Sequence, residues 1–226
     1  MAALRELGEE TGVSIEDEKR LKMLPSLNTI PSRTAQMMQI YQVNITKEEY
    51  EKRVFEFFEK QRNEQNIRFY GLATWECFRV SKESSNFLSL TQVIDLAKQV
   101  GGSTHGFRFI QLPYNLQFDQ AYMQRNQPVD SNELSILELA KQSDIGVFTS
   151  VPLMQGKLLE WIKNKPEFTH QSPSVNALQF IRSTPGVLAP LVGQKLDLHV
   201  KENLQVLEIP PFSEEEFSSL LKKLVQ

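Results

Sequence analysis

Apolar residues follow two alternating patterns from about residue 46 to the C-terminus. Short apolar runs predict strands, and each run is followed by a segment whose apolar residues recur at the spacing of a helix face. The predicted strands are residues 67–72, 107–112, 145–149 and 187–192. Their regular alternation with helices predicts βα units in a parallel α/β sheet, and this spacing fits a doubly wound sheet and a (β/α)₈ barrel equally.

Helix starts are marked by capping patterns, in which Ser, Thr or Asp precedes Glu or Gln by three residues. Such pairs predict helices that begin at Thr46, Ser89, Asp130 and Ser213. Ser172-Pro173 predicts a further start, because proline is favoured in the first turn of a helix. The segment from Val187 to Asn203 predicts a strand, a turn at Gly193 and a helix with Val200, Leu204 and Leu207 on its apolar face.

The turn between the last predicted strand and its helix is a candidate anion site. A glycine there lets backbone N–H groups approach a phosphate at the positive end of a helix, so Gly193 to Lys195 could hold one. The alternative is that Gly193 only allows a tight turn. The spacing of the residues does not choose between the two interpretations.

Composition narrows the class of protein. The 226 residues carry a net charge of −3, and Lys and Arg form no cluster, which argues against a nucleic-acid or anionic membrane surface. The single cysteine, Cys77, excludes an internal disulfide, and next to Trp75 and Phe78 it is expected to pack rather than to act as a nucleophile. The acidic start does not resemble a signal peptide, and no apolar run is long enough to cross a bilayer. These features predict a globular cytoplasmic protein.

Residues 1–43 differ in character from the rest. Glu6, Glu9 and Glu10 share one face of a predicted helix that Gly12 ends, an arrangement that suits Mg²⁺ or, alternatively, a solvated acidic surface. The run Arg5 to Val13 resembles the C-terminal half of the Nudix hydrolase box, which implies divalent metal and diphosphate hydrolysis. The first half of that box would lie before Met1. Residues 1–43 are therefore interpreted as a Nudix-like fragment with a short helix and strand.

Five segments of residues 45–210 resemble aldo-keto reductases in the same order along the chain. They are residues 67–75, 109–112, 151–159, 177–187 and 187–203. The resemblance implies that residues 44–226 are the C-terminal half of a (β/α)₈ TIM barrel, from a family that carries out NADP-dependent carbonyl reduction. It implies NADP(H) as the cofactor.

The resemblance assigns a role to each of ten residues. Gln111 would hold the nicotinamide carboxamide. The diphosphate would lie at Pro152, Leu153 and Gly156, the adenosine 2′-phosphate at Gly193, Gln194, Lys195 and His199, and the adenine at Glu202 and Asn203. Each of these residues alone could instead be an ordinary polar or surface residue at the end of an element.

The chain also departs from the family pattern. Ala73-Thr74 replaces a common Ser-Asn pair, and Ser150 stands where an aromatic residue often stacks on nicotinamide. The family's catalytic Asp, Tyr, Lys and His belong to the first four strands, so no catalytic residue is predicted. The sequence thus predicts an aldo-keto reductase-like NADP-dependent domain, truncated and inactive alone. The alternatives are a fragment of a Nudix-type Mg²⁺-dependent diphosphate hydrolase and a non-catalytic nucleotide-binding module.

Half of a barrel would leave open edges and an exposed interior face. We expect self-association through those edges, with Leu72, Phe109 and Val147 contributing to the exposed apolar surface. Residues 37–43 are the candidate for a strand added beside the first predicted strand. They could alternatively belong to the Nudix-like fragment.

Overall fold

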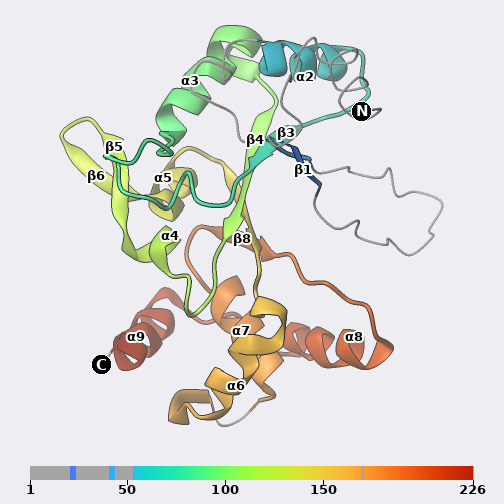
Figure 1. Ribbon diagram of the computed structural model, residues 1–226, viewed down its shortest axis with the longest axis vertical. Coiled ribbons are helices and arrows are strands. Elements are labelled where there is room, and N and C mark those ends of the chain that lie inside the picture. The colour runs from blue at the N-terminus through green and yellow to red at the C-terminus, as the bar shows by residue number, and fades with distance from the viewer. Residues whose placement is uncertain (1–20, 24–40, 44–52, 169–170, 226) are drawn as a thin grey trace. The chain divides into compact units, whose positions relative to one another are not determined.

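The computed structural model describes residues 21–23, 41–43, 53–168 and 171–225 (Figure 1). The chain divides into two compact units, one formed by Met1–Ala73 with Gln92–Phe107 and the other by Thr74–Thr91 with Arg108–Gln226. Glu6, Glu9 and Glu10, and the predicted boundary at residue 44, lie outside the described residues. The Nudix-like fragment and its metal site therefore stay predictions.

The predicted strands form one sheet. They are β3 (Tyr70–Ala73), β4 (Phe107–Pro113), β7 (Gly146–Ser150) and β8 (Val187–Pro190), in the order β3-β4-β7-β8. β7 pairs with β4 and with β8, parallel in both cases, and Gln111 lies opposite Phe148. The prediction of a parallel α/β sheet is confirmed for β4, β7 and β8. Parallel pairing brings their C-terminal ends to one edge.

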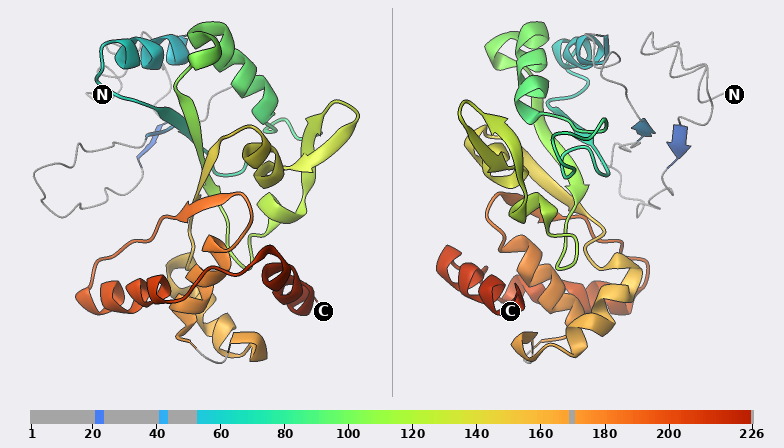
Figure 2. Two further views of the ribbon diagram at one scale, coloured as in Figure 1. Left: turned by 180° about the vertical axis from the view of Figure 1, so that it is seen from behind. Right: turned by 60° about the vertical axis from the view of Figure 1, so that its left-hand side comes forward.

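Helix α7 organises the C-terminal part of the larger unit. The helices there are α5 (Ile136–Gln142), α6 (Lys157–Lys163), α7 (Pro173–Arg182), α8 (Asp197–Leu204) and α9 (Glu214–Val225). α7 packs against β8, α6 and α8 (Figures 1 and 2). Its first turn is capped as predicted, because the Ser172 hydroxyl accepts a hydrogen bond from Val175 N. Ala177 packs with Leu158 and Ile162, while Val175 and Leu178 pack with Val206.

A hairpin replaces the first part of the helix predicted to start at Asp130. Strands β5 (Arg125–Val129) and β6 (Asn132–Ser135) pair antiparallel, and helix α4 (Gln120–Met123) precedes them. Asp130 lies in the turn with φ 52°, a left-handed conformation that Asp tolerates. Helix α5 begins at Ile136 because Ser135 and Glu138 form the capping box that the structure uses. The prediction placed the helix start five residues too early, because the Asp130 and Glu133 pair has the same spacing.

The smaller unit is built on aromatic contacts. It contains α2 (Arg53–Asn63), β3 and most of α3 (Leu90–Gly101). The ring of Phe55 lies 5.8 Å from that of Tyr70 and 5.9 Å from that of Phe107, between centroids. Val93, Ile94 and Ala97 of α3 are buried, as their helical spacing predicts.

Residues 41–43 do not extend the sheet beside β3. Strand β2 (Tyr41–Val43) pairs antiparallel with β1 (Leu21–Met23) in a separate two-stranded sheet. A backbone edge can pair with whichever strand satisfies its hydrogen bonds, and apolar composition alone does not select the partner. The predicted addition of this strand beside β3 is therefore wrong for residues 41–43.

Two further expectations about exposure are wrong. Val147, expected on the open face of the sheet, is fully buried, because alternation along β7 turns it to the opposite face from Phe148. Leu204 and Leu207, predicted on the apolar face of a helix, are 47% and 69% exposed. The last turn after Leu204 is a 3₁₀ segment (Gln205–Glu208), so the α-helical spacing that joined the two residues to Val200 does not continue.

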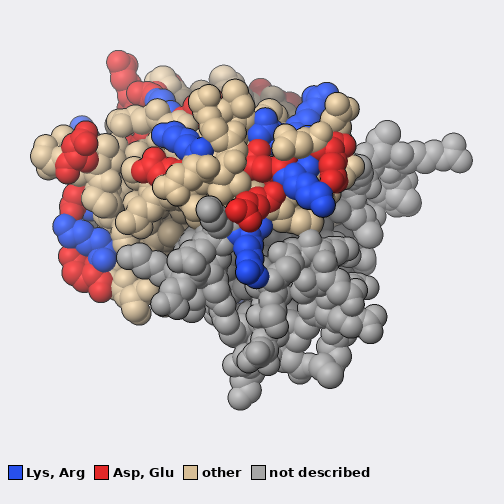
Figure 3. Space-filling model, turned by 90° about the horizontal axis from the view of Figure 1, so that it is seen from above, with Lys and Arg blue, Asp and Glu red and all other residues tan. Residues whose placement is uncertain are grey.

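Surface charge agrees with the composition. On the face shown in Figure 3, Lys and Arg side chains lie among Asp and Glu side chains over the described residues. Across the part of the chain that the structure describes, no helix is both long and apolar enough to span a membrane.

Candidate functional site

The C-terminal ends of β4, β7 and β8 carry the predicted binding residues of the larger unit. Gln111 lies near the end of β4 and is half-buried. Its carbonyl oxygen accepts hydrogen bonds from Thr74 N at 2.8 Å and from Thr74 Oγ1 at 3.3 Å. Thr74, one of the departures from the family pattern, therefore fixes the backbone of Gln111. The ends of parallel strands are where barrel folds bind ligands.

The loop after β7 has an unusual backbone. Val151, Met154 and Gln155 have φ angles of 51°, 48° and 56°, and Gly156 has φ 90°. Left-handed conformations are uncommon in residues other than glycine, and for a β-branched residue such as Val151 the strain is on the order of 1–3 kcal/mol. Hydrogen bonds from Met154 N to the Val151 carbonyl and from Gly156 N to the Leu153 carbonyl, 3.2 and 2.8 Å long, hold the loop.

Asn115 joins this loop to the end of β4. Its side chain is fully buried, and Nδ2 donates to the Val151 carbonyl at 2.9 Å. Its Oδ1 accepts from Gln117 N at 2.8 Å and from Phe118 N at 2.9 Å. The sequence analysis did not identify Asn115 as a functional residue. The signal was present, because asparagine after a buried strand commonly hydrogen-bonds a nearby backbone.

Leu153 brings the loop close to the segment after β8. Leu153 and Val192 both pack against the core cluster of Val175, Leu178 and Val206. Pro152, the preceding residue, is buried, and Gly156 is the residue before the first turn of α6. The tertiary structure thus brings together two segments that the sequence separates by about forty residues.

Gly193 has no conformational role of its own. Its φ is not positive, and a Cβ built on it meets no atom within 4 Å. The tight-turn interpretation of this glycine is therefore wrong, because any residue could adopt its backbone. Gln194 and Lys195, next to it, are exposed between β8 and α8.

The remaining predicted residues lie on α8. Ser174 Oγ donates to Glu202 Oε1 at 2.8 Å, which ties α8 to the first turn of α7. The hydrogen bonds of Ser174 and Ser172, with the nearby charge of His199, lower the pKa of Glu202. His199 is exposed, and Asn203 is 5% exposed. Glu202 is thus held as an anionic acceptor beside Asn203.

Two other side chains of the larger unit that could take part in chemistry are made less reactive by burial. The Tyr114 side chain is fully buried, its hydroxyl accepts a hydrogen bond from Thr184, and burial raises its pKa. Burial also raises the pKa of the Cys77 thiol, which disfavours the nucleophilic thiolate. Within the described ranges, no group of three or more His, Cys, Asp or Glu side chains could hold a metal ion.

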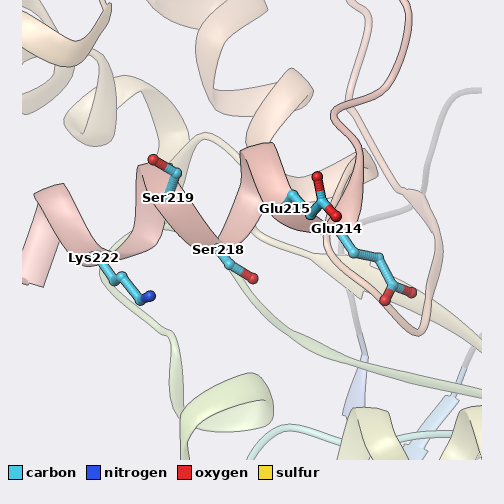
Figure 4. A pocket seen from close by; sticks show the side chains of 5 residues that line it. All are labelled: Glu214, Glu215, Ser218, Ser219 and Lys222. Carbon is cyan, nitrogen blue, oxygen red and sulfur yellow. The ribbon is translucent and has the colours of Figure 1, made fainter.

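A hollow on α9 is a separate surface feature. It is lined by Glu214, Glu215, Ser218, Ser219 and Lys222, which project from one helix (Figure 4). Glu214 also pairs with Lys141 at 2.9 Å. With every lining side chain on a single exposed helix, the hollow has no second wall and is not a candidate site.

Comparison with protein-family models finds no match, and comparison with curated protein sequences finds none either. Solved structures give similarities to aldo-keto reductases. The thermostable aldo-keto reductase Tm1743, solved with the inhibitor epalrestat, matches with a TM-score of 0.53 and 18% identity over 76% of this chain and 54% of that chain. Aldo-keto reductase AKR11C1 from Bacillus halodurans matches in its holo and apo forms with TM-scores of 0.50, at 18% identity, over 76% of this chain and 55% and 56% of theirs.

The chain thus spans about half the length of these reductases. At this low identity the similarity concerns the fold alone. The chain has an α/β fold whose parallel sheet is similar to part of the aldo-keto reductase barrel.

Proposed function

We propose that the chain binds an NADP-type dinucleotide across the C-terminal ends of β4, β7 and β8. The nicotinamide carboxamide lies at Gln111, and the diphosphate lies along the loop of Pro152, Leu153 and Gly156. The adenosine end extends to α8. This order of groups follows the order of the strands in the sheet and the aldo-keto reductase resemblance of the same segments.

The observation that carries the proposal is the left-handed loop after β7. Strained backbone of this kind is found where a site must hold a fixed shape. Successive backbone N–H groups near left-handed residues can form concave donors for anions. Met154 N and Gly156 N donate within the loop and fix its shape, so the diphosphate is proposed to bind the other N–H groups of the loop. The loop lies where barrel folds bind phosphates.

Charge at the adenosine end supports the NADP form of the cofactor. Lys195 is an exposed cation beside Gly193, and His199 follows within the first turn of α8. Open space around Gly193 leaves room for a phosphate next to the Lys195 ammonium group. Glu202 and Asn203 supply a hydrogen-bond acceptor and an amide for the exocyclic amine and ring nitrogen of adenine.

Binding without turnover is the expected activity of this chain. Carbonyl reduction needs a positioned proton donor beside the nicotinamide. Tyr114, which follows β4, does not serve, because its buried hydroxyl is bound to Thr184 and its pKa is raised. We expect no oxidation of NADPH by the chain with a panel of aldehydes, and measurable turnover that is lost on mutation of a residue in this site would contradict this part of the proposal.

Calorimetric titration with NADPH and NADH tests the binding. Lys195→Glu should weaken NADPH binding by about ten- to a hundredfold, because a charged hydrogen bond to the 2′-phosphate is lost, and should leave NADH affinity nearly unchanged. Lys201→Glu, at an exposed lysine on α8, is the matched control for net charge. A chain that binds neither nucleotide overturns the proposal.

A further inference from the structure

Asn115 uses its whole side chain to connect two loops. Its carbonyl oxygen accepts from Gln117 N and Phe118 N, which closes the turn after β4. Its amide nitrogen donates to the carbonyl of Val151, the residue that follows β7. The side chain is fully buried, so water does not compete for these bonds.

The bond to Val151 acts at the most strained residue of the loop. Val151 has φ 51°, and its carbonyl also accepts from Met154 N at 3.2 Å. A β-branched residue leaves this conformation unless its surroundings hold it there. Three further left-handed residues, Met154, Gln155 and Gly156, follow in the same loop.

We infer that Asn115 is the positioning residue of the loop that binds the dinucleotide diphosphate. It touches no part of the nucleotide. Through the Val151 carbonyl, Asn115 keeps the loop in its binding shape before the ligand arrives, so less ordering is needed on binding. The inference rests on the proposed function for the identity of the ligand, and on the hydrogen-bond geometry for the role of Asn115.

Asn115→Asp separates the two functions of the side chain. The carboxylate still accepts from Gln117 N and Phe118 N, but it cannot donate to the Val151 carbonyl. Gln117→Glu is the matched control, because it adds the same charge two residues away on an exposed side chain. Asn115→Ser is the second variant if Asn115→Asp does not fold, since the hydroxyl keeps the turn and is too short to replace the amide.

Amide hydrogen exchange is measured without ligand, and NADPH binding by calorimetry. In Asn115→Asp the amides of Met154 and Gly156 should exchange faster, while amides of the sheet stay protected, and NADPH affinity should fall by about tenfold. Val151→Gly tests the coupling, because glycine adopts the left-handed conformation without strain. In the double variant Asn115→Asp with Val151→Gly, protection of the loop amides and NADPH affinity should recover part of their loss. An effect of the added charge alone would not allow this recovery.

Each result decides the inference. Unchanged exchange in Asn115→Asp, equal loss of affinity in Gln117→Glu, or no recovery in the double variant overturns it. Faster exchange with unchanged NADPH affinity also overturns it, because the loop would then not need Asn115 to bind. If the unaltered chain binds no NADPH, the proposed function fails, and the exchange data still decide whether Asn115 holds the loop.

Discussion

Glu59 of α2 accepts a hydrogen bond from the Tyr70 hydroxyl at 2.8 Å, and this pair lies in the interior of the smaller unit. The same carboxylate oxygen accepts from Gly106 N at 2.6 Å, and the other oxygen accepts from Arg62. Glu59 is 6% exposed. A buried carboxylate with three donors fixes α2 to β3 and to the residue before β4.

Glu59→Ala should destabilise the chain by about 2–4 kcal/mol, because the Tyr70 hydroxyl and the Gly106 N–H lose a buried acceptor. Urea denaturation followed by circular dichroism measures the change. Glu56→Ala on the exposed side of the same helix is the control and should shift the free energy of unfolding by less than about 0.5 kcal/mol. Equal effects of the two variants would show that the hydrogen bonds of Glu59 contribute nothing.

The hydrogen bonds of Glu59 should also make the stability of the chain sensitive to acid. Burial raises its pKa, but the hydrogen bonds from Gly106, Tyr70 and Arg62 outweigh burial and hold the pKa below the ordinary value of 4.5. Its contribution to stability is therefore complete above about pH 4.5 and is lost as the pH falls through the lower folded-state pKa. Between pH 7 and pH 3 the melting temperature should fall less in Glu59→Gln than in the unaltered chain. Identical dependence of the two melting temperatures on pH would contradict the prediction.

Two glycines of the larger unit should respond differently to alanine. Gly186 has φ 89°, and a Cβ there would lie 2.6 Å from the Leu137 carbonyl oxygen, so Gly186→Ala should cost about 1–3 kcal/mol. Gly193→Ala should leave the melting temperature unchanged, since its Cβ meets open space. If the 2′-phosphate binds beside Gly193, NADPH affinity falls in Gly193→Ala while stability does not. A destabilised Gly193→Ala variant would contradict the structure.

Ser135 should be the functional cap of α5. Removing the hydroxyl in Ser135→Ala leaves Glu138 N without its partner and should cost about 1 kcal/mol. Ser131→Ala, in the hairpin turn, should cost less than about 0.5 kcal/mol. Chemical denaturation compares the two, and an equal or larger loss in Ser131→Ala would show that the Ser135 hydroxyl does not cap α5.

Self-association stays a prediction, and Leu188 gives it a test. This β8 residue is 55% exposed and lies beside Gly146 of β7. Burying one such side chain between copies contributes about 1.5–3 kcal/mol, so Leu188→Lys should shift the chain toward monomer. Size-exclusion chromatography with light scattering over a range of concentrations measures it, with Leu207→Lys as the exposed control. A monomer at every concentration would end this expectation. A chain that stays monomeric after deletion of residues 1–43 would also show that this segment is not needed to cover the exposed apolar surface.

Local signals were sufficient for several elements. Ser172-Pro173 fixed the start of α7, and Ser213 with Glu216 fixed the start of α9, because a cap satisfies backbone donors within the same few residues. The strands β4 and β7 followed from short, mostly apolar segments of seven and five residues, whose length is typical of strands. Fold class depends on such repeated local patterns, so the sequence alone determined a parallel α/β sheet.

Relationships between distant residues were decided only by the tertiary structure. The bond from Asn115 to Val151 and the carboxylate of Glu59 beside Tyr70 each depend on partners that are distant in the sequence. The choice of Ser135 over Asp130 as a helix cap follows from the β5–β6 hairpin, in which Arg125 pairs with Ser135. Hydrogen-bond donors and acceptors at loops have several local options of nearly equal free energy, and packing selects one of them. The positions of the candidate site residues could therefore be predicted as an ordered list, but the buried asparagine that holds their central loop could not.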